Sequence, residues 1–261
     1  MSTADWIDRD LGTREVSWTD RDPILYALAV GARPDELDLV HETRLHVLPP
    51  FALTLAQWAP DVLGDAGAFD TSTAVQGAQR LQVLAPMPAA GTASMTARVA
   101  AVWDKGAAAV FEVEVACEYF VATWSLFCPG AGGFGGERGP GRAPTPTGEP
   151  DWSAPLPVAE NAALLYRLLG DRHPIHVDPS AARGIGADHP ILHGLATLGA
   201  AALVAARVKG REPWSLRDLE GRFTGHVLPG ETLTAHGWAD GALRVDGPRG
   251  TVVDGARVLF G

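Results

Sequence analysis

The sequence predicts an α+β protein of two tandem units of similar size, each with an antiparallel sheet wrapped around a central apolar helix. The first supporting observation is a segment rich in glycine and proline, residues 129–152, which favours neither helix nor strand and divides the chain. On each side of it a helical segment precedes a series of strand-like runs. Strands and helices do not alternate along the chain, which argues against a Rossmann or TIM-barrel fold.

The first unit, residues 1–128, begins with a helical or irregular segment and continues with a short helix predicted at Phe51–Trp58. The run VFEVEV at residues 110–115 places Phe and two Val on one face and two Glu with one Val on the other, as in a half-buried strand. Asp104-Lys105-Gly106 predicts a hairpin turn. Strands are expected at Ala78–Leu84, Thr92–Trp103, Ala107–Tyr119 and Val121–Phe127.

The second unit, residues 153–261, contains the run GLATLGAAALVAARV at 194–208, which is apolar on nearly every face and predicts a buried helix. Asp240-Gly241 predicts a hairpin turn. Strands are expected at Ser215–Phe223, Glu231–Ala239, Ala242–Asp246 and Gly250–Phe260.

Composition excludes several functional classes. The formal net charge of -10 argues against a nucleic-acid-binding role, because phosphate binding requires a basic face. No apolar run reaches the roughly 18 residues that a membrane-spanning helix needs. Cys117 and Cys128 are too few for a four-cysteine zinc site and are expected to be reduced thiols. The chain ends Val-Leu-Phe-Gly and lacks a Ser-Lys-Leu peroxisomal signal, so we expect a cytoplasmic location.

The glycine-rich run GAGGFGGERG within residues 129–152 resembles a phosphate-binding loop only superficially. It lacks the Gly-Lys-Ser/Thr ending of a P-loop, and the prolines that follow prevent a helix from starting there. We therefore interpret it as part of a linker.

The segment YRLLGDRHPIHVDP, residues 166–179, carries the predicted chemistry. Asp171 and His176 lie five positions apart, and Pro174 favours an extended conformation at His173, so a turn can bring the carboxylate and the imidazole together. Gly170 permits a backbone conformation that other residues resist. A carboxylate beside a histidine is suited to holding a water molecule and removing its proton.

A second element, Pro190-Ile191-Leu192-His193-Gly194, immediately precedes the apolar helix. Unpaired N–H groups at a helix start can stabilise a thioester oxygen as it becomes negative. Each residue also has a simpler interpretation, since Asp171 can cap a turn and His176 can be a packed core residue. A metal site of Asp171, His173 and His176 is a further alternative, but no additional ligand is identified, so no metal is expected.

The segment GDRHPIHVDP resembles the hydratase 2 motif of MaoC-like proteins, whose usual form is Gly-Asp-x-Asn-Pro-Leu-His. The run PILHGLATLG at 190–199 and the segment VLPGETL at 227–233, together with Arg222-Phe223, are similar to later signatures of that family. DRDPILYALAVGA at 20–32 and the glycine-rich run are similar to its first unit and its linker. The resemblance covers nearly the whole chain and points to the two-unit hydratase 2 type, as in peroxisomal multifunctional enzyme type 2.

This resemblance implies a double hotdog fold, usually dimeric, and reversible hydration of trans-2-enoyl-CoA to (3R)-3-hydroxyacyl-CoA without a metal or redox cofactor. It implies that Asp171 and His176 activate water and return a proton to the α-carbon, and that the Gly194 N–H binds the thioester oxygen. The first unit is expected to accommodate the acyl chain and to be non-catalytic. The residues expected to bind substrate are Gly170, His173, Ile191 and Leu192.

Two positions depart from the family pattern. His173 replaces the motif Asn; histidine can donate a hydrogen bond but is larger and can change charge, so we expect an altered substrate fit or pH profile. The usual His-Gly-Glu-Gln is Gln76-Gly77-Ala78-Gln79 here, which weakens a role for this stretch in substrate contact. Of the other histidines, His189 and His193 lie near the motif, and we expect them to be solvated or packing residues.

Two other functions remain open from the sequence. One is a 3-hydroxyacyl-thioester dehydratase that acts on an acidic carrier protein, and the other is a catalytically weak hotdog subunit that binds an acyl thioester. The presence of both Asp171 and His176 argues against the second. A basic patch for a carrier protein, or equally for the phosphates of CoA, has as candidates Arg207, Lys209, Arg211, Arg217 and Arg222.

Overall fold

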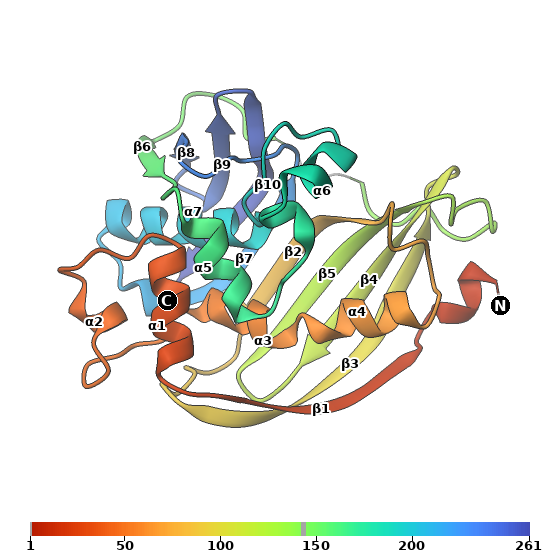
Figure 1. Ribbon diagram of the computed structural model, residues 1–261, viewed down its shortest axis with the longest axis horizontal. Helices are drawn as coiled ribbons and strands as arrows, with labels where there is room; N and C mark the ends of the chain where they lie inside the picture. The colour runs from red at the N-terminus through yellow and green to blue at the C-terminus, as the bar shows by residue number, and fades with distance from the viewer. Residues whose placement is uncertain (1, 142–144) are drawn as a thin grey trace.

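A computed structural model describes residues 2–141 and 145–261 (Figure 1). The strands of the first unit are β1 (Asp10–Trp18), β2 (Val75–Val83), β3 (Gly91–Asp104), β4 (Ala108–Ala116) and β5 (Phe120–Pro129). Its helices, with 3-10 helices written η, are η1 (Thr3–Trp6), α1 (Arg21–Ala29), α2 (Leu37–Val40), η2 (Pro49–Phe51), α3 (Ala52–Ala56) and α4 (Trp58–Asp65).

The second unit has the same order of helices before most of its strands. Its strands are β6 (Trp152–Pro157), β7 (Leu216–Phe223), β8 (Thr232–Gly237), β9 (Ala242–Gly247) and β10 (Gly250–Phe260). Its helices are α5 (Ala162–Tyr166), η3 (Arg167–Leu169), η4 (Pro174–His176), α6 (Pro179–Gly184), α7 (Gly194–Lys209) and η5 (Pro213–Ser215).

The ten strands of the described residues form one antiparallel sheet in the order β1-β3-β4-β5-β2-β7-β10-β9-β8-β6. Each unit therefore supplies five strands, and the two halves join where β2 pairs with β7, from Ala78 opposite Arg222 to Gln82 opposite Asp218. Helices α3 and α4 cross the first half and α7 packs against the second (Figure 1). The predicted α+β arrangement of two units, each with a sheet around a helix, is confirmed, and the structure adds that the two sheets are continuous.

Helix α7 is the central helix of the second unit. Its residues from Leu195 to Ala206 are all buried, as the sequence of small and apolar side chains predicts. Glycine allows the closest approach to a neighbouring helix, since a Cβ at Gly199 would lie 2.2 Å from the hydroxyl oxygen of Tyr26 on α1. This close contact joins α1 of the first unit to the core of the second unit.

The predicted interior strands are found within a few residues of their expected limits, whereas the two edge strands were not predicted. Most β1 side chains are exposed or half-buried, so this strand has no regular apolar alternation. Strand β6 contains Pro155 and Pro157, which the edge of a sheet tolerates because one side of the strand needs no ladder hydrogen bonds. The predicted helix at Phe51–Trp58 continues to Asp65, and Pro60 lies in the first turn of α4.

The predicted linker begins as β5 ends at Pro129 and finishes as β6 begins at Trp152; its residues 142–144 lie outside the described part of the chain. Its glycine N–H groups bind a carboxylate of the protein itself. Gly133 and Gly135 donate to the two oxygens of Asp104 at 2.9 and 2.8 Å. These donors are thus occupied, which agrees with our interpretation of the run as a linker.

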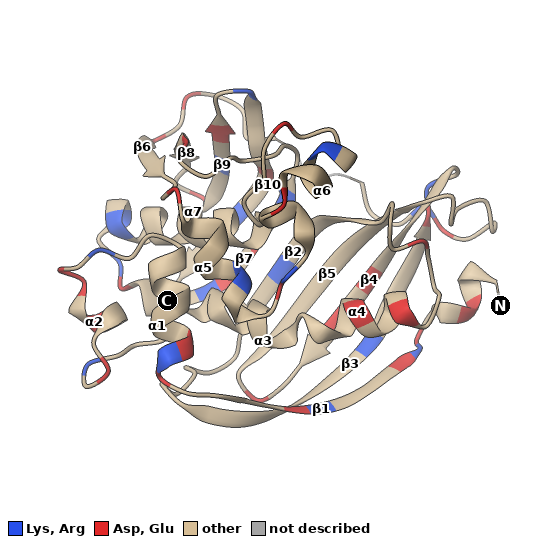
Figure 2. Ribbon diagram, viewed as in Figure 1, with Lys and Arg blue, Asp and Glu red and all other residues tan. Residues whose placement is uncertain are grey.

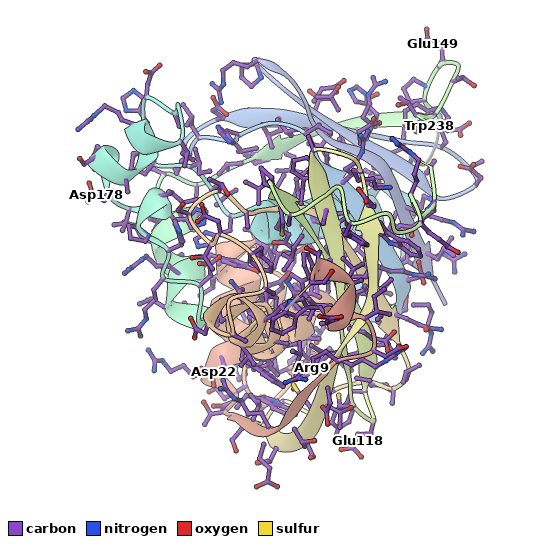
Figure 3. The ribbon with its side chains drawn as sticks, turned by 90° about the vertical axis from the view of Figure 1, so that its right-hand side faces the viewer. Arg9, Asp22, Glu118, Glu149, Asp178 and Trp238 are labelled. Carbon is purple, nitrogen blue, oxygen red and sulfur yellow. The ribbon has the colours of Figure 1, made fainter. Side chains whose placement is uncertain are left out.

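Acidic and basic residues are interspersed along the ribbon (Figure 2). In the side view of Figure 3, Trp238 lies on the side of the molecule formed by strands, and Asp178 lies on the opposite side, which is formed by helices. Among the described residues, none of the helices has the length and apolar character needed to cross a membrane.

Candidate active site

The loop after α5 shapes the segment that the sequence singled out. η3 ends at Gly170, whose φ of 136° is a conformation that favours glycine. His173 is extended, with φ -55° and ψ 132°, as expected for a residue before proline, and Pro174–His176 then forms a single 3-10 turn. The chain reverses between Asp171 and His176 and brings the two side chains together.

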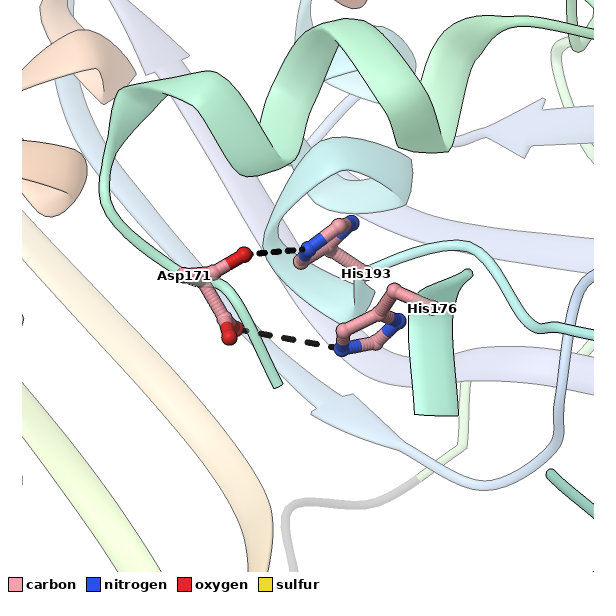
Figure 4. Close-up of side chains that lie close together, drawn as sticks. All are labelled: Asp171, His176 and His193. Atoms are coloured by element: carbon pink, nitrogen blue, oxygen red, sulfur yellow. Dashed lines mark hydrogen bonds and ion pairs between the residues drawn. The ribbon is translucent and has the colours of Figure 1, made fainter. Parts of the chain in front are cut away.

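Asp171 and His176 face each other across a gap of 3.8 Å between Oδ2 and Nε2 (Figure 4). The His176 Nδ1–H donates to the carbonyl of Ile191 at 2.8 Å. A neutral imidazole has one donor and one acceptor nitrogen, so Nε2 presents a lone pair to the carboxylate. Two acceptors at this separation suit a water molecule that donates one hydrogen to each.

The electrostatic environment keeps the two groups in the forms that this water requires. Burial alone raises the pKa of Asp171, but the neighbouring His193, the Gln57 side chain and the hydrogen bond from the His173 N–H outweigh it and lower that pKa. Burial also lowers the pKa of His176. Near neutral pH the site therefore holds a carboxylate and an uncharged imidazole.

His193 is a site residue to which the sequence assigned no role beyond packing or solvation. It is only 2% exposed, its ring stacks on that of His176 with centroids 3.5 Å apart, and it contacts the ring of Tyr166 at 4.7 Å. Its Nε2–H donates to the backbone carbonyl of Asp171 at 3.2 Å (Figure 4). The signal available in the sequence was its place directly before the helix-starting Gly194.

Gly194 is the first residue of α7, as predicted, and lies beside His193. A Cβ at this position would come within 3.0 Å of the Phe223 ring, so glycine is what allows β7 and the helix start to approach. The first turn of this 16-residue helix carries no acidic side chain. Its free N–H groups and partial positive charge suit an oxygen that becomes negative.

The other predicted substrate-binding residues take different positions. His173 is exposed, and its Nδ1 accepts from the Ile175 N–H at 3.4 Å, so it caps the 3-10 turn. The Ile191 and Leu192 side chains are 7% and 5% exposed and pack in the interior. Within the site, the visible contribution of Ile191 is its backbone carbonyl, which orients His176. That these residues contact substrate stays a prediction.

The first unit also reaches the site. Gln57 lies at the junction of α3 and α4, and its side-chain amide is close enough to the Asp171 carboxylate to lower the pKa of that group. The neighbouring Thr54 carbonyl would lie 3.6 Å from a Cβ at Gly170. Asp61 on α4 is exposed at the rim, and partial burial followed by the proximity of Asp171 raises its pKa.

Metal ligation deserves a geometric test, because Asp171, His176 and His193 each offer a ligand atom within 4.8 Å of the others. This set contains His193 where the sequence had suggested His173. The two imidazole planes are only 20° apart and their centroids are 3.5 Å apart, so their in-plane lone pairs lie in separate, nearly parallel planes and do not converge on one ion. The arrangement fits a water molecule between two acceptors better than a tetrahedral metal ion.

Comparison with known proteins identifies the family of this chain. The MaoC like domain model matches residues 142–257, and the MFE-2 hydratase 2 N-terminal domain model matches residues 16–120. The chain belongs to the MaoC-like hydratase 2 family. It is 37% identical to "Enoyl-CoA hydratase ChsH3" of Mycobacterium tuberculosis, over 95% of this chain and 92% of that protein. It is also 37% identical to "3-hydroxyacyl-thioester dehydratase Y" of the same organism, over 85% and 82%.

Solved structures show the same fold. A MaoC-like dehydratase from Phytophthora capsici superposes with a TM-score of 0.88 at 23% identity, over 98% of this chain and 97% of that one. The M. tuberculosis protein RV0216, reported to have a double hotdog fold, superposes with a TM-score of 0.61 at 14% identity, over 100% and 98%. The double hotdog fold implied by the sequence resemblance is confirmed for this family member.

Proposed function

We propose that this protein catalyses the reversible hydration of trans-2-enoyl-CoA to (3R)-3-hydroxyacyl-CoA. The observation that carries the proposal is the 3.8 Å gap between the Asp171 carboxylate and the lone pair of His176 Nε2. The name of the M. tuberculosis relative, an enoyl-CoA hydratase, supports the same reaction on the same thioester class.

In the proposed hydration, the water between Asp171 and His176 attacks C3 of the enoyl thioester. A C3–O bond forms as the double bond between C2 and C3 breaks, and electron density moves to the thioester oxygen, which the Gly194 N–H stabilises. The dyad takes one proton from the water and returns it to C2, so atoms and charge balance without a redox cofactor. Dehydration follows the same steps in reverse.

Dehydration of a carrier-bound 3-hydroxyacyl thioester is the second candidate, supported by the name of the relative "3-hydroxyacyl-thioester dehydratase Y". It would use the same residues. The basic patch suggested for a carrier protein is weakened by pairing, since Arg207 is bound to Glu36 and Arg222 to Asp254. The pairing weakens this patch for the phosphates of CoA as much as for a carrier protein, so we favour the CoA ester on the name of the relative that matches more of this chain.

We also propose that the first unit accommodates the acyl chain and that the protein is a homodimer, as the family resemblance implies, and that it is located in the cytoplasm. Light scattering during size-exclusion chromatography tests the dimer, and a monomer at micromolar concentration would contradict it. Fractionation of the native cells tests the location.

The decisive experiment follows the loss of conjugated-thioester absorbance when purified protein is mixed with crotonyl-CoA and longer trans-2-enoyl-CoAs. Chiral chromatography identifies the product enantiomer. We expect the 3R product, and we expect Asp171→Asn, which preserves shape but removes the charge, to reduce kcat by at least about 100-fold. A folded wild-type protein without turnover on any chain length, or an active Asp171→Asn variant, would contradict the proposal.

A further inference from the structure

His193 links three parts of the candidate site that are separate in the sequence. Its backbone immediately precedes the helix start at Gly194. Its Nε2–H holds the backbone carbonyl of Asp171, and its ring covers that of His176. The proposed hydration assigns no proton transfer to this residue, although it is among the most buried polar side chains of the described chain, at 2% exposure.

These contacts restrict the two proposed catalytic groups in different ways. The hydrogen bond at 3.2 Å restrains the Asp171 backbone, and hence the origin of its carboxylate. The stack at 3.5 Å restrains the plane of the His176 ring, whose rotation is already limited by the bond to Ile191. Loss of both restraints would let the 3.8 Å gap for water vary, and small displacements of reacting groups reduce rates strongly.

Charge explains why this position must remain neutral. The groups that face the His193 ring are His176 on η4, Asp171 on the preceding loop, Arg167 on η3 and Tyr166 on α5. A proton on His193 would place a cation against His176 and oppose the uptake of a proton there. Burial, followed by the proximity of His176, lowers the pKa of His193 to about 4, so the ring is uncharged near neutral pH.

We propose that His193 is a positioning residue for the Asp171–His176 pair, acting as an imidazole that donates from Nε2 and stacks on His176. The inference rests on the proposed hydration for its catalytic readout. It assigns His193 a role in geometry and electrostatics, distinct from the proton transfers of the two residues that it holds.

Two substitutions separate the donor from the ring. His193→Phe keeps a flat ring for stacking but removes the Nε2–H, whereas His193→Gln keeps a donor but loses the ring. The matched control is His189→Phe, the same substitution at an exposed histidine nearby. We expect His193→Phe to lower kcat by about 10-fold or more with KM within about 3-fold of wild type, because the contact acts on the reacting groups and not on substrate binding.

His193→Gln should retain more of kcat than His193→Phe, and its pH profile should differ from that of wild type because a group next to His176 has been removed. His189→Phe should match wild type in both. A kcat for His193→Phe within 2-fold of wild type, with an unchanged pH profile, would overturn the proposal. If His193→Phe does not fold, an unchanged kcat and pH profile in His193→Gln would overturn it equally.

A measurement without substrate distinguishes failure of this inference from failure of the proposed function. Imidazole 15N NMR of the wild-type protein should show His193 as the neutral Nε2–H tautomer from pH 8 to pH 6, and His193→Phe should shift the His176 resonances. A protonated His193 at pH 7, or His176 resonances unaffected by the substitution, would refute the positioning role even in a protein that hydrates no enoyl-CoA.

Discussion

The Gln57 side chain offers the sharpest test of how the first unit contributes to the site. It extends from the junction of α3 and α4 toward the carboxylate of Asp171, which belongs to the second unit, and lowers the pKa of that carboxylate. A hydrogen bond to a charged group contributes about 1.5–3 kcal/mol when fully buried. The Asp171 side chain is 21% exposed, so the lower end applies, and about 1.4 kcal/mol corresponds to about one pKa unit.

The direction of the expected change in the Asp171 pKa follows from which form of the Asp171 carboxyl group the Gln57 amide stabilises. The Gln57 amide binds the ionised carboxylate and lowers the pKa of Asp171, so Gln57→Leu should raise that pKa by about one unit. Gln57→Glu places a second carboxylate there and should raise it further. Because hydration needs ionised Asp171, the acidic limb of the kcat/KM profile should move to higher pH in the order wild type, Gln57→Leu, Gln57→Glu.

The assay combines kinetics with a direct titration. Protonation of His176 also reduces activity at low pH, so the Asp171 carboxyl is followed separately by 13C NMR. Gln82→Leu, the same change at an exposed glutamine on β2, serves as the control. It should leave both the pH profile of kcat/KM and the NMR titration of Asp171 unchanged. A pKa for Asp171 in Gln57→Leu within about 0.3 units of wild type would refute the reasoning, because it would mean that the amide does not stabilise the carboxylate.

Three further predictions follow from single contacts. The pKa of His193 falls from 6.5 to about 4 on folding, so the unfolded chain binds the proton more readily, and the free energy of unfolding should fall by up to about 3 kcal/mol between pH 6.5 and pH 4. Urea unfolding at pH 7 and pH 4.5 should show a smaller fall in His193→Gln than in wild type, and an equal fall would contradict this. Gly194→Ala should lower kcat by about 10- to 100-fold with little loss of melting temperature, because the new Cβ would lie 3.0 Å from the Phe223 ring and displace the start of α7. Unchanged kinetics would argue against Gly194 as the donor to the thioester oxygen. Asp104→Ala should make the glycine-rich linker more sensitive to limited proteolysis, because two glycine N–H groups lose their acceptor, and unchanged cleavage would show that the carboxylate does not hold the linker in place.

The sequence predicted those parts of the fold whose signal is local. Helix α7 is apolar on every face because it is buried on every face, and β4 alternates because only one of its faces packs on the core. Edge strands β1 and β6 carry no such signal, since one side of each is free and side-chain burial along them is slight. The joining of β2 to β7 is likewise a long-range pairing that periodicity cannot specify.

The same distinction applies to the site. Asp171 and His176 were predictable because one turn brings them together, and Gly194 because a helix start is recognisable in sequence. His193 and Gln57 reach Asp171 only through tertiary packing, the first because the start of α7 meets the loop after η3 and the second through the approach of α3 to Gly170. Nothing in the local sequence distinguishes Gln57 from an ordinary surface residue, and the position of His193 before Gly194 does not by itself show what its side chain contacts.

Asp171 therefore depends on both units, even though the predicted catalytic motif lies in one. Its carboxylate accepts from the His173 N–H at 3.1 Å within its own loop, Gln57 of the first unit lowers the pKa of that carboxylate, and His193 holds the backbone of Asp171. The continuous sheet sets this arrangement, because the pairing of β2 with β7 fixes the first unit, and thus α3, relative to the second. A second unit produced alone would lose the Gln57 contact and expose the Asp171 loop, so the first unit is needed for the ionisation state of the dyad as well as for any acyl-chain contact.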